Sequence, residues 1–176
     1  MARFPPLQQE GFADMYSKIC AALSKISLMI ATFGLSIVIV CVLYQVFGRY
    51  ILNNTPTWAE ALALLIVLYV TMLGTAVGVR DAGHIGMESL LAICPQPYKN
   101  YLEIFIHGLV AIFGACMSYN GALLARSAMD YNIPTLPLPE GLYNIPITIA
   151  GALIVLFSIE HIIALINGTE VQPSWH

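Results

Sequence analysis

Residues 57–88 read TWAEALALLIVLYVTMLGTAVGVRDAGHIGME, and residues 61–79 within this stretch are almost entirely apolar. An apolar run of this length predicts a helix that crosses a membrane. The polar and interfacial side chains at its two edges are Trp58, Glu60, Arg80, His84 and Glu88. Side chains of this kind at the edges of a bilayer indicate that the helix is held against a neighbouring helix, a partner protein or lipid headgroups.

The rest of the chain has the composition of a membrane protein. Hydrophobic residues make up 59% of the 176 residues and charged residues only 10%. Further apolar runs cover residues 26–47, 104–124 and 145–166. Because a crossing needs about 20 apolar residues, four crossings fit and little of the chain is left for a soluble domain. We therefore predict an all-α integral membrane protein with four transmembrane helices.

Turn-forming residues give the expected bounds of these helices. The predicted four-helix transmembrane domain covers residues 26–166, with crossings at about 26–50, 57–80, 98–126 and 139–166. Residues 53–56, NNTP, form a turn before the second crossing. The outer connection, residues 129–142, contains three prolines and is expected to be stiff and largely extended. If Pro139 opens the last helix, Pro146 lies inside it and should kink it.

Two shorter amphipathic segments flank the crossings. In residues 12–26 the apolar side chains recur at the spacing of one helical stripe, which indicates either a helix lying in the membrane interface or an extension of the first crossing. Residues 87–94 repeat the pattern and predict a short surface helix that Pro95 ends. The expected layout is a cytoplasmic tail and interfacial helix at residues 1–25 and a second cytoplasmic tail at residues 167–176.

The distribution of Lys and Arg predicts the orientation. Positive residues favour the cytoplasmic side of a membrane. The side that carries both termini has Arg3, Lys18, Lys25, Arg80 and Lys99, against Arg49 and Arg126 on the other side. We therefore expect both termini in the cytoplasm. The first long apolar run begins at residue 26 and is too long for the apolar region of a signal peptide, so we expect no cleavable signal.

Several functional classes find no support in the sequence. The four cysteines are isolated, which favours small apolar fillers over a disulfide framework or a metal site. There is no basic cluster for a nucleic acid. The apolar runs carry no charged residue at the bilayer midplane, so we expect no ion or proton relay.

The polar residues near the ends of the predicted helices allow two readings each. Glu60 can cap the second helix, and an Arg49–Glu60 contact across the outer hairpin is easy to form; alternatively, these residues contact a partner or lipid headgroups, with Tyr50 and Trp58 as interfacial anchors. Arg80 and its neighbours can snorkel and pair locally, or bind the phosphate of an anionic lipid. A third group can reach headgroups or pair among themselves, and its role stays open: Glu103, His107, Glu160 and His161.

Small residues indicate where helices approach closely. The candidate positions for helix packing are Gly74, Gly78, Gly114 and Gly151.

The ordered motif around the second crossing resembles the small membrane subunit of tripartite ATP-independent periplasmic (TRAP) transporters, the DctQ-like family. The likeness extends over helix number and spacing from about residue 28 to residue 167. The chain departs from the family pattern at Ala61, where a second acid is common, and at Glu88, where an Asp is common. The matching positions are Phe47, Gly48, Arg49, Tyr50, Asn54, Pro56, Trp58, Glu60, Leu62, Gly74, Arg80, Gly83, His84, Ile85 and Glu88.

The resemblance implies a bacterial inner-membrane scaffold and not an enzyme. In such systems a periplasmic substrate-binding protein delivers an organic acid, such as a dicarboxylate or sialic acid, to two membrane subunits. The large subunit is expected to bind sodium and to move the substrate, so this chain needs no cofactor of its own. The resemblance places Arg49, Tyr50, Trp58, Glu60, Arg80, His84 and Glu88 at contacts with the large subunit or with phospholipids.

Two other classes stay open as alternatives. A four-helix membrane redox protein of the b-type cytochrome kind would use His107 and His161, which lie at similar depth. A self-sufficient small exporter would need a carboxylate within its first helix, and residues 26–47 contain none.

Overall fold

The computed structural model describes residues 9–54, 56–81 and 96–167. Within these residues the chain forms four α-helices and one short 3-10 helix. These elements are α1 (Gln9–Tyr50), α2 (Thr57–Asp81), α4 (Gln96–Ser127), η1 (Glu140–Tyr143) and α5 (Ile145–Asn167). Each α-helix is long and apolar enough to cross a membrane. The predicted all-α membrane fold is confirmed.

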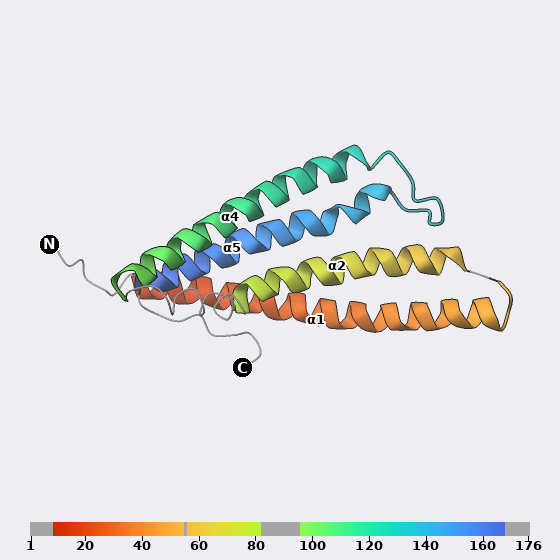
Figure 1. The fold of residues 1–176 in the computed structure, drawn as a ribbon, viewed down its shortest axis with the longest axis horizontal. Helices are drawn as coiled ribbons and strands as arrows, with labels where there is room; N and C mark the ends of the chain where they lie inside the picture. The colour runs from red at the N-terminus through yellow and green to blue at the C-terminus, as the bar shows by residue number, and fades with distance from the viewer. Residues whose placement is uncertain (1–8, 55, 82–95, 168–176) are drawn as a thin grey trace.

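The helices are arranged as two antiparallel hairpins (Figure 1). One hairpin consists of α1 and α2, and the other of α4 and α5. The hairpins pack together chiefly through α2 and α5, and α1 also reaches α5. We call the end where α1 begins and α5 finishes the terminal end. The opposite end, with the α1–α2 and α4–α5 connections, is the turn end. Figure 1 shows the hairpins close together at the terminal end and diverging toward the turn end.

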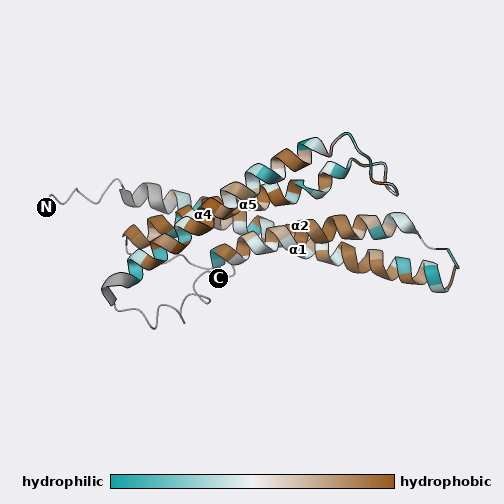
Figure 2. Cartoon of the chain, turned by 45° about the horizontal axis from the view of Figure 1, so that its top comes forward, coloured by the Kyte–Doolittle hydropathy of each residue, from teal (hydrophilic) through white to brown (hydrophobic). Residues whose placement is uncertain are grey.

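Hydrophobic residues recur along all four α-helices (Figure 2), and many of the large ones are exposed on the outside of the bundle. On α1, for example, Phe33 is 70% exposed and Val40 is 64% exposed. Such exposure would be costly in water, but lipid tails are as apolar as these side chains. The surface therefore fits a helix bundle surrounded by lipid.

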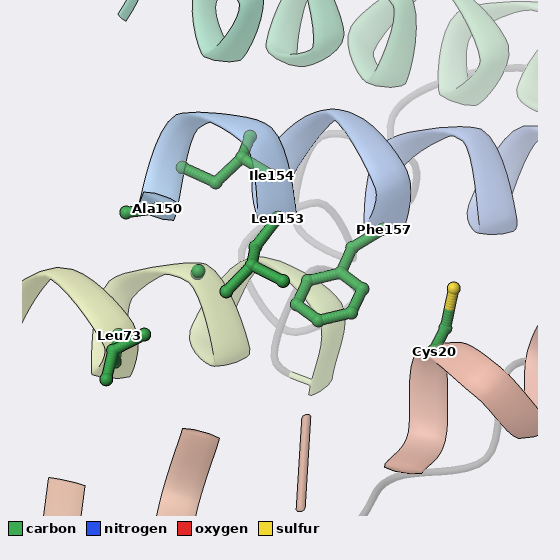
Figure 3. Packing of buried hydrophobic residues seen from close by; sticks show 7 residues of the cluster. Cys20, Leu73, Ala150, Leu153, Ile154 and Phe157 are labelled. Atoms are coloured by element: carbon green, nitrogen blue, oxygen red, sulfur yellow. The ribbon is translucent and has the colours of Figure 1, made fainter. Parts of the chain in front are cut away.

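The interior packs around the contact between α2 and α5. Leu73 from α2, Leu153 and Phe157 from α5 and Cys20 from α1 belong to one buried cluster, and Figure 3 shows Leu153 and Phe157 pointing from α5 toward α2. Cys20 is a buried free thiol. Since lipid removes most of the hydrophobic driving force between helices, close packing contributes much of the stability here.

Glycine allows α4 and α5 to approach backbone to backbone. A Cβ atom on Gly151 would lie 2.5 Å from the backbone nitrogen of Ser118 and 2.7 Å from the carbonyl oxygen of Gly114. A Cβ on Gly114 would meet Ile154 at 2.9 Å. The Ser118 hydroxyl also donates a hydrogen bond to the Thr148 carbonyl at 3.1 Å. The two glycines therefore lie in a tight contact between the helices.

Gly74 and Gly78 occupy a different environment. Among the described residues, no atom lies within 4 Å of a Cβ built on either glycine. These glycines on α2 therefore do not pack closely against any of the described helices, unlike Gly114 and Gly151.

The first helix is continuous from Gln9 to Tyr50. The amphipathic stripe of residues 12–26 therefore belongs to the first turns of α1, which was the second of the two readings that the sequence allowed. A helix of 42 residues is about 63 Å long, about twice the thickness of a hydrocarbon core. Part of α1 must therefore tilt or project beyond the apolar layer.

The connection before α5 differs from the expectation. It is not extended: Ile133 donates to the carbonyl of Leu138, and Glu140 donates to that of Tyr131, so the chain folds back on itself. Pro139 precedes η1, and α5 starts only at Ile145. Pro146 therefore lies in the first turn of α5, where a missing N–H breaks no helical hydrogen bond and no kink is needed.

We predict that Gly151→Ala will destabilise the isolated chain, because the added methyl group must push α4 away from α5. Overpacking of this kind costs about 1 to 3 kcal/mol. The matched control is Gly74→Ala, whose methyl group enters open space and should have little effect. Thermal unfolding in detergent, followed by circular dichroism, measures both. Equal stability of the two variants would contradict the tight contact.

Candidate functional site

Arg80, near the end of α2, is a charged residue buried inside the bundle. Its side chain is 1% exposed. Its Nε donates to Oε2 of Glu160 at 2.9 Å, and its Nη2 donates to Oε1 of the same carboxylate at 3.0 Å. Its Nη1 donates to Asp81 at 3.0 Å. The guanidinium thus forms a two-bonded fork with one carboxylate and binds a second, an arrangement that defines direction as well as distance.

Glu160 also connects α5 to the first helix. The Ser17 hydroxyl of α1 donates to Oε1 of Glu160 at 2.9 Å. The neighbouring Tyr16 hydroxyl donates to the carbonyl of Leu156, one turn before Glu160 on α5, at 2.9 Å. A single carboxylate on α5 therefore accepts hydrogen bonds from both α1 and α2.

His161 adds a third connection between α2 and α5. Its Nε2 lies 2.8 Å from the carbonyl oxygen of Arg80. A carbonyl oxygen only accepts hydrogen bonds, so Nε2 must carry the hydrogen. This bond occupies one of the last four carbonyls of α2, which have no partner within their own helix.

The remaining helix, α4, contacts this group of residues through His107. Its ring stacks on that of His161, with centroids 4.5 Å apart and planes inclined by 6°. Both histidines are buried. Two axial haem ligands would have to face each other across a macrocycle, whereas these two rings are packed directly against one another. The geometry therefore fits a packing contact between α4 and α5.

We call this group of residues from all four α-helices the charged joint. Its members are Ser17, Arg80, Asp81, His107, Glu160 and His161. Burying such charges is expensive, and a buried ion pair often contributes little net stability. Removing one partner of the ion pair, however, leaves the other as an unpaired buried charge, which is strongly destabilising. Each charged residue of the joint therefore requires its partner to be present. The joint is better suited to define how the helices are placed than to add stability.

The path of the chain explains why these residues meet. Ser17 is near the start of α1 and Arg80 near the end of α2, and antiparallel packing brings these points to the terminal end. Glu160 lies about 10 Å before the end of α5, at a similar depth. Phe157, one turn earlier, places its ring 6.0 Å from the Arg80 guanidinium carbon. Apolar packing thus shields the joint on one side.

The turn end has weaker connections between the hairpins. The Tyr69 hydroxyl of α2 donates to the carbonyl of Leu142 at 3.2 Å. The Tyr143 hydroxyl of η1 donates to the carbonyl of Ala61 at 3.4 Å. Both are neutral hydrogen bonds, which are roughly half as strong as charge-assisted ones.

The residues predicted at the outer hairpin are all exposed. Tyr50 is 75% exposed and Trp58 is 45% exposed, and Arg49 and Glu60 are also at the surface. The ion pairs of the described residues are those of Arg80, so the expected Arg49–Glu60 contact is not formed. Trp58 instead packs against Tyr44, with ring centroids 5.8 Å apart. The exposed groups are left facing outward.

The other residues predicted to make contacts lie in different places. Arg80 lies inside the bundle, so we remove it from the expected surface for lipid or partner contacts. His84 and Glu88 lie outside the described residues, as does the predicted surface helix at residues 87–94. Glu103 is half-buried on α4, one turn before His107.

Sequence reasoning identified most members of the joint but did not assemble them. It allowed local pairing for Arg80 and mutual pairing for Glu160 and His161, and it did not single out Ser17. A usable signal existed: the only Arg and the only Glu at comparable depths of the two most apolar helices are Arg80 and Glu160. A buried charge in a membrane needs a partner at its own depth.

Comparisons with known proteins agree with the fold. The model of the family described as "Tripartite ATP-independent periplasmic transporters, DctQ component" matches residues 38–168. The C4-dicarboxylate TRAP transporter small permease protein DctQ of Pseudomonas aeruginosa is 35% identical over 80 residues, which are 46% of this chain and 35% of that protein.

Two proteins that are named for sialic acid transport are also similar to this chain. The TRAP transporter small permease protein SiaQ of Vibrio cholerae is 22% identical over 124 residues, or 70% of this chain and 72% of that protein. The TRAP transporter permease protein SiaT of Haemophilus influenzae is 31% identical over 86 residues, or 49% of this chain. The match covers only 13% of SiaT, so most of SiaT lies outside the matched segment.

The family match covers most of the chain and includes all four spanning helices at least in part. It describes a component of a transporter and not an enzyme. Together with the four apolar helices, it identifies a multi-pass protein of the inner membrane. The chain therefore belongs to the DctQ component family of the tripartite ATP-independent periplasmic transporters.

Proposed function

We propose that this chain is the small scaffold subunit of a sodium-coupled TRAP transporter and that it braces a large, moving permease subunit. The observation that carries this proposal is the charged joint. Arg80 and Glu160 bind each other, and the same carboxylate receives Ser17. These groups are used to hold helices together, which suits a rigid support.

The names of the relatives support the assignment of partners. Two of them are small permease proteins of TRAP transporters, so a large membrane subunit and a periplasmic substrate-binding protein are the expected partners. The relatives are named for sialic acid and for C4-dicarboxylates, which are both carboxylate anions. An organic acid is accordingly the substrate class. The coupling sodium ions belong to the large subunit, and this chain needs no cofactor.

The outer hairpin supplies the proposed contact surface. Arg49, Tyr50, Trp58 and Glu60 are exposed and lack the mutual ion pair that would hold the two charged groups in place. Charged and aromatic side chains of this kind suit the headgroup layer, where they can bind the large subunit or phospholipids. His84 and Glu88 remain proposed contacts at the opposite edge.

The orientation follows from the charges, with the terminal end in the cytoplasm. Arg80 is neutralised inside the bundle and should count less toward orientation. Lys18, Lys25 and Lys99 still lie toward the terminal end, and Arg49 and Arg126 lie toward the turn end. This distribution keeps the bias that places the termini inside.

Reconstitution tests the proposed function directly. Vesicles that contain both membrane subunits and receive the binding protein should take up the organic acid when a sodium gradient is applied. Vesicles with this chain alone should show no uptake, and vesicles with the large subunit alone should show strongly reduced uptake. Uptake by this chain alone, or full uptake without it, would contradict the scaffold role.

The contact surface has its own test. Arg49→Ala and Glu60→Ala should each reduce co-purification with the large subunit, because each removes a charged group from the proposed interface. Arg126→Ala is the matched control, since Arg126 is also exposed near the turn end but lies on α4. Quantitative pull-down in detergent measures the yield. Unchanged yields for both variants would show that the interface lies elsewhere.

A further inference from the structure

The two hairpins are held together by unequal means at their two ends. Toward the turn end, among the described residues, α2 and η1 are joined by the neutral hydrogen bonds of Tyr69, which lies midway along α2, and of Tyr143, at 3.2 and 3.4 Å. At the terminal end Arg80 makes two charge-assisted bonds to Glu160, at 2.9 and 3.0 Å. Shorter, charged bonds are the stronger ones. The angle between the hairpins therefore depends mainly on the terminal end.

The fork between Arg80 and Glu160 restrains more than a distance. The guanidinium is planar, and its two parallel bonds to one carboxylate define the relative rotation of α2 and α5 as well as their separation. The hydrogen bond from His161 to the Arg80 carbonyl connects the same two helices at a second point. Two separate attachments resist sliding and twisting together.

The remaining members extend this restraint to the other two helices. Ser17 attaches α1 to the Glu160 carboxylate. His107 stacks on His161 and so attaches α4. A change in the position of Glu160 would thus be felt by every spanning helix.

The energetics of buried charge indicate why this arrangement is used. A buried ion pair can often be replaced by apolar residues of similar volume with little loss of stability, or even a gain. Stability alone therefore gives no reason to place Arg80, Asp81 and Glu160 inside the bundle. The need for a single geometry does give a reason. Apolar side chains can slide past each other, whereas a two-bonded Arg–carboxylate pair holds one relative position of its helices.

We propose that Arg80 and Glu160 are positioning residues that set the angle between the α1–α2 and α4–α5 hairpins, and that transport by the assembled complex requires this angle. The inference rests on the proposed scaffold function. A moving subunit exerts force on its support, and a support whose hairpins swivel would yield instead of guiding the motion. The joint should thus affect the rate of transport per complex more than the formation of the complex.

The test replaces the charges of the joint without leaving an unpaired one. The variant is Arg80→Met with Asp81→Asn and Glu160→Met. The matched control is Arg126→Met with Asp130→Asn and Glu140→Met, which removes the same three charges from exposed positions near the turn end. Both are assembled with the large subunit, and substrate uptake is measured per assembled complex as maximal rate and KM.

The joint variant should assemble in normal yield, yet its maximal rate per complex should fall about tenfold or more, as expected when a supporting shell becomes loose, with KM unchanged. Spin labels at Leu64 on α2 and Leu123 on α4, both exposed, report the distance between the hairpins in a cysteine-free background. Their distance distribution should broaden in the joint variant and stay narrow in the control.

Three results would overturn the proposal. They are a normal rate per complex, an unchanged distance distribution, or failure of the joint variant to assemble, since the last would assign the joint to folding. Failure of the proposed scaffold function would look different from failure of this inference. In that case even the wild-type chain would not stimulate uptake by the large subunit.

Discussion

A guanidinium buried within a membrane-spanning bundle needs its counter-charge within hydrogen-bonding distance, because neither lipid nor water can stabilise it there. In this protein that requirement is met by Glu160, which lies on another helix and binds Arg80 through both carboxylate oxygens. The helices must therefore take the one arrangement that brings these two residues together. The placement of α1 and α4 then follows through Ser17 and His107.

The remaining packing is consistent with a fixed support. Gly114 and Gly151 allow α4 and α5 to form a tight hairpin, and Phe157 and Leu153 fill the contact with α2. The outward surface is apolar and suits lipid. Among the described residues, the buried acidic and guanidinium side chains are Arg80, Asp81 and Glu160, and they bind one another. Groups that are used to hold helices together suit a support better than a carrier of anions. The chain's membership in the DctQ component family makes it a component of a transporter, and the supporting role is our proposal.

Much of the fold could be predicted from the sequence because the signals are local. Apolar runs and turn residues located the four crossings, and α2 begins and ends within one residue of the expectation. Signals that depend on context failed. Nothing local distinguishes a Pro139 start from a start at Ile145, or an extended loop from one that folds back through Ile133. The glycine pattern likewise did not distinguish Gly114 and Gly151, which lie in a tight contact, from Gly74 and Gly78, where no described atom of this chain lies within 4 Å of a built Cβ.

The candidate site was less predictable because its contacts join distant parts of the chain. Arg80 and Glu160 are eighty residues apart, and an Arg at a helix end is compatible with snorkelling as well as with burial. The Arg49–Glu60 contact was expected because both residues flank one turn, yet both remain exposed and apart. Closeness in sequence favoured the Arg49–Glu60 pair, which does not form. The Arg80–Glu160 pair forms because the two residues lie at a similar depth on neighbouring helices.

If the proposed scaffold function holds, this chain stays still while the large subunit moves. The most direct test records the distance between spin labels on Leu64 and Leu123 in the assembled transporter, first at rest and then during sodium-driven uptake. The account predicts the same narrow distribution in both states. A second distance that appears only during turnover would contradict it, because the two hairpins would then be moving parts.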